Sequence, residues 1–210
     1  MTQFRLLRPW RDASSDCHGV AAIEFALIVP IVVTLFMGAF ELTNVILLDM
    51  KLTSAAQTAA DLVTQTEFTN GGVITVLSNA SFAGFTNAAQ KVMTPFPATD
   101  KNGNPTLKIA YASFAYNTGA PVLSWHYEEN GATPISANSV PDNQDLTQLG
   151  TAAAGSNDTV VVVSAQYTYT SPISYVLKKS YAFTEAAFDR PRYVTSITTC
   201  QNQPNATGCP

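Results

Sequence analysis

The longest apolar run in the chain extends from Val20 to Phe40 and contains one charged residue, Glu24. A helix needs about 20 apolar residues to cross the hydrocarbon core of a bilayer. The run therefore predicts a transmembrane helix. A removable secretory signal is the less favoured alternative, because its apolar core is usually about 7–15 residues long and ends at a small-residue cleavage site.

A second apolar pattern follows the run and has the period of a helix. Its apolar positions recur three or four residues apart, which places them on one helix face. They are Val45, Leu48, Leu52, Ala55, Ala59 and Leu62. The two patterns together predict one helix from Val20 to near Thr64, with a projecting second half that packs against another element. Pro30 is expected to kink this helix, because proline lacks a backbone donor and crowds the preceding turn.

Beyond Gly71 and Gly72 the pattern changes. Short helices are predicted between Val73 and Val92, and a long polar loop between Asn130 and Asn157. Period-two or continuous apolar runs predict four strands. These are Leu107–Phe114, Val122–Tyr127, Thr159–Tyr169 and Tyr181–Phe188. The fold class predicted is α+β, with the long N-terminal helix packed on a small antiparallel β-sheet domain.

Charge indicates how the chain is oriented in a membrane. Only 12% of residues are charged, the net charge is −4, and the 11 Lys and Arg residues form no basic stripe, so nucleic-acid binding is not expected. Arg5, Arg8 and Arg11 precede the apolar run, and the next basic residue is Lys51. The positive-inside rule then places the N-terminus in the cytoplasm and the remainder across the membrane, which in a bacterium is the periplasm.

Cys200 and Cys209 lie close together near the end of the chain. In an oxidising compartment they could form a disulfide that closes a small loop. The alternative is two unrelated thiols.

Catalytic and metal-binding patterns are missing from the sequence. A membrane-tethered hydrolase would need a clustered acid, base and nucleophile, and the chain has only two histidines, His18 and His126. The adjacent acids Glu128 and Glu129 are expected on opposite faces of a strand. Asp100–Asn104 resembles the start of a calcium loop but lacks the later EF-hand residues, so a turn is favoured. We expect no enzyme activity, no metal and no cofactor.

Glu24 is the most informative residue of the apolar run. A carboxylate inside a membrane helix costs a few kcal/mol unless it finds a partner or reaches water. Gly19 immediately precedes Val20, and cleavage between them would free an α-amino group that Glu24 of a neighbouring subunit could neutralise. The alternative is that Glu24 lies at the interface and is hydrated.

The sequence around Glu24 resembles a known family. Gly19–Phe25 is similar to the prepilin-peptidase site of the tight-adherence (Tad, or Flp) branch of type IV pilins, which has glycine, four residues, glutamate and an aromatic residue. The continuation through Pro30 and the segment Ala55–Asp61 resemble a TadE-like pseudopilin. Softer similarities to the outer part of such proteins lie at Thr94–Pro97, Val122–Trp125 and Phe188–Arg192.

The resemblance implies a pilin-like fold with four parts. Residues 1–19 would be a cytoplasmic leader, 20–40 the transmembrane helix, 41–66 a projecting amphipathic helix and 67–210 a periplasmic α+β domain. A prepilin peptidase would cut between Gly19 and Val20, and Glu24 and Phe25 would set the register of the helix against other subunits.

The resemblance also implies partners. They are the prepilin peptidase, the major Flp pilin, other minor pseudopilins, the inner-membrane assembly platform and the lipid bilayer. The size of the outer domain favours a low-copy minor subunit of the Tad pilus, either held in the bacterial inner membrane or incorporated in the fibre. The alternative function is an uncleaved, single-pass envelope or adhesion protein with a periplasmic binding domain.

Overall fold

The structure is a computed structural model. It describes residues 18–66, 69–70, 73–74, 76–116, 120–136, 140, 145–150, 158–171, 180–197 and 199. The chain divides into two compact units, Met1–Asn44 and Val45–Pro210. Helix α1 (His18–Gln65) contributes its first part to the first unit and its second part to the second unit.

Helix α1 confirms the predicted long N-terminal helix. The helix is continuous through Pro30. Proline has no backbone amide hydrogen, so position 30 cannot donate the usual helical hydrogen bond to the carbonyl of Ala26. One turn later the Thr34 hydroxyl donates a hydrogen bond to the Pro30 carbonyl at 2.7 Å. The expected kink at Pro30 remains a prediction.

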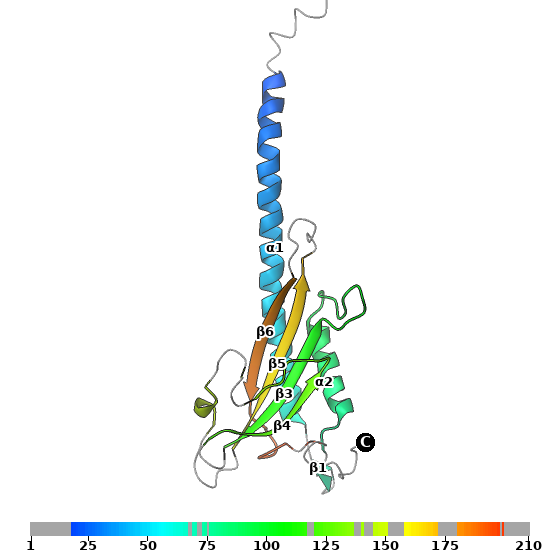
Figure 1. Cartoon of the computed structure of the whole chain (residues 1–210), viewed down its shortest axis with the longest axis vertical. Helices are drawn as coiled ribbons and strands as arrows, with labels where there is room; N and C mark the ends of the chain where they lie inside the picture. Colours follow the sequence, from blue (N-terminus) through cyan, green and yellow to red (C-terminus); the bar gives the residue numbers. More distant parts are fainter. Residues whose placement is uncertain are drawn as a thin grey trace, which may run out of the picture. The chain divides into compact units, whose positions relative to one another are not determined.

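The second unit contains a four-stranded antiparallel sheet in the order β4-β3-β5-β6 (Figure 1). Its strands are β3 (Leu107–Ala115), β4 (Val122–Glu129), β5 (Thr159–Thr170) and β6 (Ser180–Asp189). All four predicted strands are therefore confirmed, and each is longer by one or two residues. β3 pairs with β4 and with β5, and β5 pairs with β6, in each case antiparallel. With the helices, the sheet makes the α+β class that the sequence predicts.

Helix α2 (Asn79–Val92) begins later than predicted. Ser78 and Ser81 form a capping box, in which each side chain bonds the backbone amide of the other. This cap satisfies backbone donors at the first turn and fixes the start of the helix. Val73, predicted as helical, instead lies in the short strand β2 (Val73–Ile74), which pairs with β1 (Thr69–Asn70).

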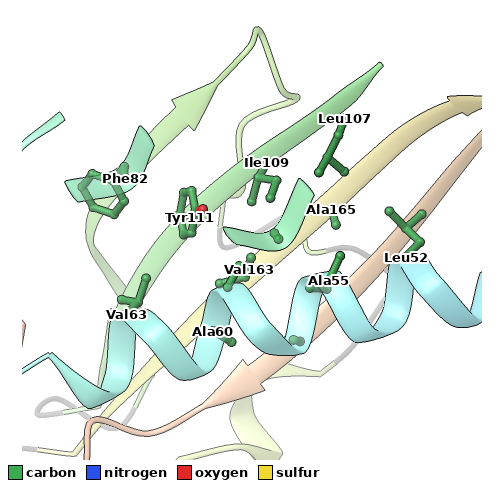
Figure 2. Packing of buried hydrophobic residues seen from close by; sticks show 14 of the residues in the cluster. Leu52, Ala55, Ala60, Val63, Phe82, Leu107, Ile109, Tyr111, Val163 and Ala165 are labelled. Atoms are coloured by element: carbon green, nitrogen blue, oxygen red, sulfur yellow. The ribbon is translucent and has the colours of Figure 1, made fainter. Parts of the chain in front are cut away.

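One face of the sheet is packed against the second part of α1 and against α2 (Figure 2). The helix contributes mainly alanines and leucines, so its backbone can approach the sheet closely. From α1 the fully or almost fully buried apolar residues are Leu48, Leu52, Ala55, Ala56, Ala59, Ala60 and Val63. They meet Ile109 and Tyr111 of β3 and Val163 of β5, as the alternation of a pleated strand requires. The apolar stripe predicted from the sequence is thus largely the helix side of the main core, but Leu62 is only half-buried and lies outside this core, and Val63 is the core residue there.

The opposite face of the sheet carries a second, smaller core. Ala112 and Phe114 of β3 and Val162 of β5 pack there against Ile135 and Leu146 of the segment between β4 and β5. This segment includes a short 3-10 helix, η2 (Leu146–Gln148). The sequence predicts only a polar loop here. Its described residues cover the sheet, because a few isolated apolar side chains are enough to anchor it.

Candidate assembly helix and its attachment to the sheet

The first part of α1 exposes apolar side chains on every side. Val20, Phe25 and Leu27 are 59%, 70% and 70% exposed, and none of the most apolar 18-residue stretch of the helix is buried. So much unburied apolar surface is unstable in water and is typical of a segment that lies in lipid or against other helices. The helix is long and apolar enough to cross a membrane, and it fits a single-pass membrane anchor.

No packing contact among the described residues requires a glycine at Gly19. A Cβ added to Gly19 would meet nothing within 4 Å, and the backbone of this residue does not adopt the positive φ that favours glycine. Glycine in a helix is about 1 kcal/mol less favourable than alanine. The packing of the described residues therefore does not explain why glycine stands at this position.

Glu24 lies one helical turn beyond Val20, on an exposed part of the helix. No ion pair joins it to another residue within the described ranges. Phe25 and Pro30 are exposed in the same segment. The predicted site residues are thus arranged along one short, accessible stretch of helix, and their proposed roles depend on partners outside the chain.

The second part of α1 is attached to the sheet by polar contacts near its C-terminal end. Arg192 donates to the carboxylate of Asp61 on α1 at 2.7 Å, and its backbone amide donates to the carbonyl of Thr64 at 3.1 Å. The Thr64 hydroxyl donates to Asp189 at the end of β6 at 2.9 Å. Near the middle of the second part, Thr53 donates to Glu185 of β6 at 3.2 Å.

These contacts hold the end of α1 beside the residues that follow β6. The Arg192–Asp61 pair is about half exposed and adds little stability by itself, so the buried side chains of different size, such as Leu52 and Ala55, set the register of the helix. Sequence reasoning did not find this attachment, because its partners are more than 120 residues apart. The only local signal is the run of charged residues from Asp189 to Arg192 directly after a predicted strand.

The polar residues singled out in the outer domain serve local structure. Asp100 accepts bonds from the backbone amides of Asn102 and Asn104, both at 2.8 Å, which confirms the predicted turn. A hydrogen bond from the Asn104 side chain at 3.0 Å, followed by these backbone bonds, holds the pKa of Asp100 below its usual value. His126 lies in β4 and contacts Glu128 at 2.6 Å.

Glu129 is on the other face of β4 and accepts a bond from Tyr127 at 2.9 Å, so the two adjacent acids do point apart. Within the described ranges, no three His, Cys, Asp or Glu residues gather in a way that could hold a metal ion. Cys200 and Cys209, the candidate disulfide, lie outside the described residues.

The structure thus combines an apolar N-terminal helix, which is suited to anchor the protein in a membrane, with an α+β domain. Residues 19–61 match the family model described as TadE-like protein. The match begins at Gly19 and ends at Asp61, the residue bound by Arg192. It confirms the resemblance to TadE-like proteins over this part of the chain. It does not include the softer similarities at Thr94–Pro97, Val122–Trp125 and Phe188–Arg192.

No curated protein and no solved structure matches the chain. The likeness of the outer domain to pilins therefore stays a prediction.

Proposed function

We propose that this protein is a minor pseudopilin that acts in the assembly of a Tad pilus. The observation that carries the proposal is what the TadE-like match covers. Residues 19–61 include the exposed large apolar residues of α1, from Val20 to Met50. An apolar helix surface without a partner in its own chain is the kind of surface that lipid or pilin helices cover.

In this proposal a prepilin peptidase cleaves between Gly19 and Val20 on the cytoplasmic side of the inner membrane. The absence of any packing reason for Gly19 supports this role, because a peptidase needs close access to the backbone. Arg5, Arg8 and Arg11 hold the N-terminus in the cytoplasm before cleavage, so the second unit lies in the periplasm.

The test of cleavage is the N-terminus of the protein isolated from its native membrane. Mass spectrometry should find a chain that begins at Val20. Gly19→Ile should retain the leader, whereas Gly38→Ile should be cleaved normally, because Gly38 lies in the same helix with equally open surroundings. A native chain that still begins at Met1 would instead support the alternative function, an uncleaved envelope or adhesion protein.

After cleavage, Glu24 neutralises the α-amino group of a neighbouring subunit and so sets the register between helices. The partners in this role are the major Flp pilin and the other minor pseudopilins, brought together at the inner-membrane assembly platform. Two opposite charges that meet in a low-dielectric environment attract each other far more strongly than in water. An uncompensated Glu24 would oppose insertion by a few kcal/mol, which gives the pairing its driving force.

The registry role is tested by Glu24→Gln, which keeps the shape of the side chain and removes its charge. We expect normal membrane insertion and cleavage but loss of pili, counted by electron microscopy. Asp49→Asn is the matched control, because Asp49 is an exposed carboxylate on the same helix but lies outside the apolar run. Normal piliation in the Glu24→Gln strain would refute the registry role while leaving the cleavage result unaffected.

A further inference from the structure

A pocket of about 340 Å³ opens on the sheet face opposite α1. Its walls are strands β3, β5 and β6 together with residues 133–134 and Val140 of the segment between β4 and β5. The side chains on this face that line it are Lys108, Ser164, Gln166, Thr168, Ala182 and Thr184. Its volume is at the lower end of the range for small-molecule sites. It lies wholly within the second unit.

The register of the strands explains why the sheet is hollow here. Lys108, Gln166 and Thr184 lie side by side across β3, β5 and β6. In the next row Ser164 lies between Ala110 and Ala186, whose side chains are too short to fill the space above it. Further along the same face the larger side chains Phe114 and Leu146 close the surface.

One wall of the pocket is held in place by a two-point contact. The Gln166 side chain accepts a hydrogen bond from the Thr133 amide at 3.1 Å and donates one to the Thr133 carbonyl at 3.4 Å. Ala132 and Ile135, on either side of Thr133 and Pro134, are buried in the second core. The wall is therefore preformed, and a ligand need not order it on binding.

Ser164 provides an independent sign of a binding site. It is fully buried, and its hydroxyl has no hydrogen-bond partner among the described residues. Buried hydroxyls in proteins are nearly always paired, and an unpaired one costs about 1–3 kcal/mol. Because Ser164 lies at the floor of the pocket, an oxygen atom of a bound molecule could supply the missing partner.

The charge of the side chains that line the pocket indicates which kind of ligand it binds. Among the described residues, Lys108 is the only charged residue that lines the pocket, no carboxylate lines it, and no ion pair involves Lys108. The other polar side chains of the described lining are the hydroxyls of Ser164, Thr133, Thr168 and Thr184 and the amide of Gln166, which is already bonded to Thr133. We propose that the pocket binds a small polyhydroxylated carboxylate, of the class formed by the uronic-acid units of acidic polysaccharides. The carboxylate pairs with Lys108, and the sugar hydroxyls bind the serine and threonine side chains.

The proposal is tested with the full chain in detergent micelles, by saturation-transfer NMR titration with glucuronate, galacturonate, glucose and inorganic phosphate. We expect saturable binding of at least one uronate and at least tenfold weaker binding of glucose. Lys108→Gln should weaken uronate binding about tenfold, the usual effect of losing a charged hydrogen-bond partner. Lys101→Gln, an exposed lysine outside the pocket, should leave binding unchanged.

A second pair of variants tests the floor of the pocket. Ser164→Ala should weaken uronate binding several-fold. Ser113→Ala should not, although Ser113 is equally a buried serine of this sheet without a hydrogen-bond partner among the described residues, because it does not line the pocket. Phosphate binding as tight as uronate binding, an unchanged Lys108→Gln variant or no binding at all would each overturn the proposal. The pocket contains no part of the N-terminal helix, so the result does not depend on cleavage after Gly19.

Discussion

The packing of α1 on the sheet makes a quantitative prediction at Leu52. Its side chain is 0% exposed and lies in the main core, facing the sheet together with Ala55 (Figure 2). Replacing a fully buried leucine by alanine costs about 3 kcal/mol, from lost transfer free energy and from the cavity that remains. For a domain of the size of Val45–Pro210, each kcal/mol lowers the melting temperature by about 3 °C. Leu52→Ala should therefore lower it by about 9 °C.

The assay uses the fluorescence of Trp125, which is 2% exposed and whose indole donates to the Ile197 carbonyl at 2.8 Å. The chain has two tryptophans, and Trp10→Phe leaves Trp125 as the only one. Thermal unfolding is then followed in detergent for the parent and for Leu52→Ala.

Met50→Ala is the matched control. Met50 lies on the same helix two residues earlier but is 63% exposed, so its truncation should shift the midpoint by less than about 2 °C. Equal shifts in Met50→Ala and Leu52→Ala would show that the helix does not dock on the sheet through the stripe predicted from the sequence. No shift in either variant would mean that α1 contributes little to the stability of the second unit.

Two further predictions concern side-chain hydroxyl groups. Thr86→Val should lower the free energy of unfolding by about 1–3 kcal/mol, because it leaves the buried Tyr111 hydroxyl without the partner that is now 3.0 Å away. The same fluorescence assay measures this loss. Thr58→Val is the control and should lower the free energy of unfolding less, because the hydrogen bond of Thr58 is exposed. Stability should also fall above pH 10, because burial, followed by the bond to Glu129, raises the pKa of Tyr127 to about 12 in the folded state. A tyrosine in the unfolded chain has a pKa near 10. The contribution of Tyr127 to the free energy of unfolding is therefore complete below about pH 10 and is lost between about pH 10 and 12. In urea unfolding, Tyr127→Phe should lose less stability over this pH range than the parent chain.

The elements of this fold were largely predictable because their signals are local. The α1 stripe repeats with the helical period over several turns, and each strand is a run of apolar or alternating residues between turn signals. The start of α2 was missed because it is set by a cap of two serines, Ser78 and Ser81, and not by the apolar residue Val73. A serine cap without an acidic residue is a weak pattern in a sequence, although its geometry in the structure is well defined.

The candidate site residues of the N-terminal helix could also be predicted from local signals, whereas the sites of the second unit could not. Gly19 and Glu24 could be singled out from sequence because their meaning depends on position within one continuous apolar run. The Arg192 attachment and the pocket above Ser164 could not, because each is assembled by strand register from residues far apart in the chain. Small residues such as Ala110 and Ala186 give no signal by themselves, since the hollow exists only once the strands place them on either side of Ser164.

The two units depend on their surroundings to different degrees. The N-terminal part of α1 has its apolar surface on all sides and so depends on whatever surrounds it, lipid or other helices. The second unit buries its own cores on both faces of the sheet, and the second part of α1 is packed into one of them. A change in the partners of the first part need not rearrange the sheet or the pocket on its far face. The proposed uronate site should therefore bind equally well before and after any cleavage at Gly19, a comparison that the NMR titration can make directly on the two forms of the chain.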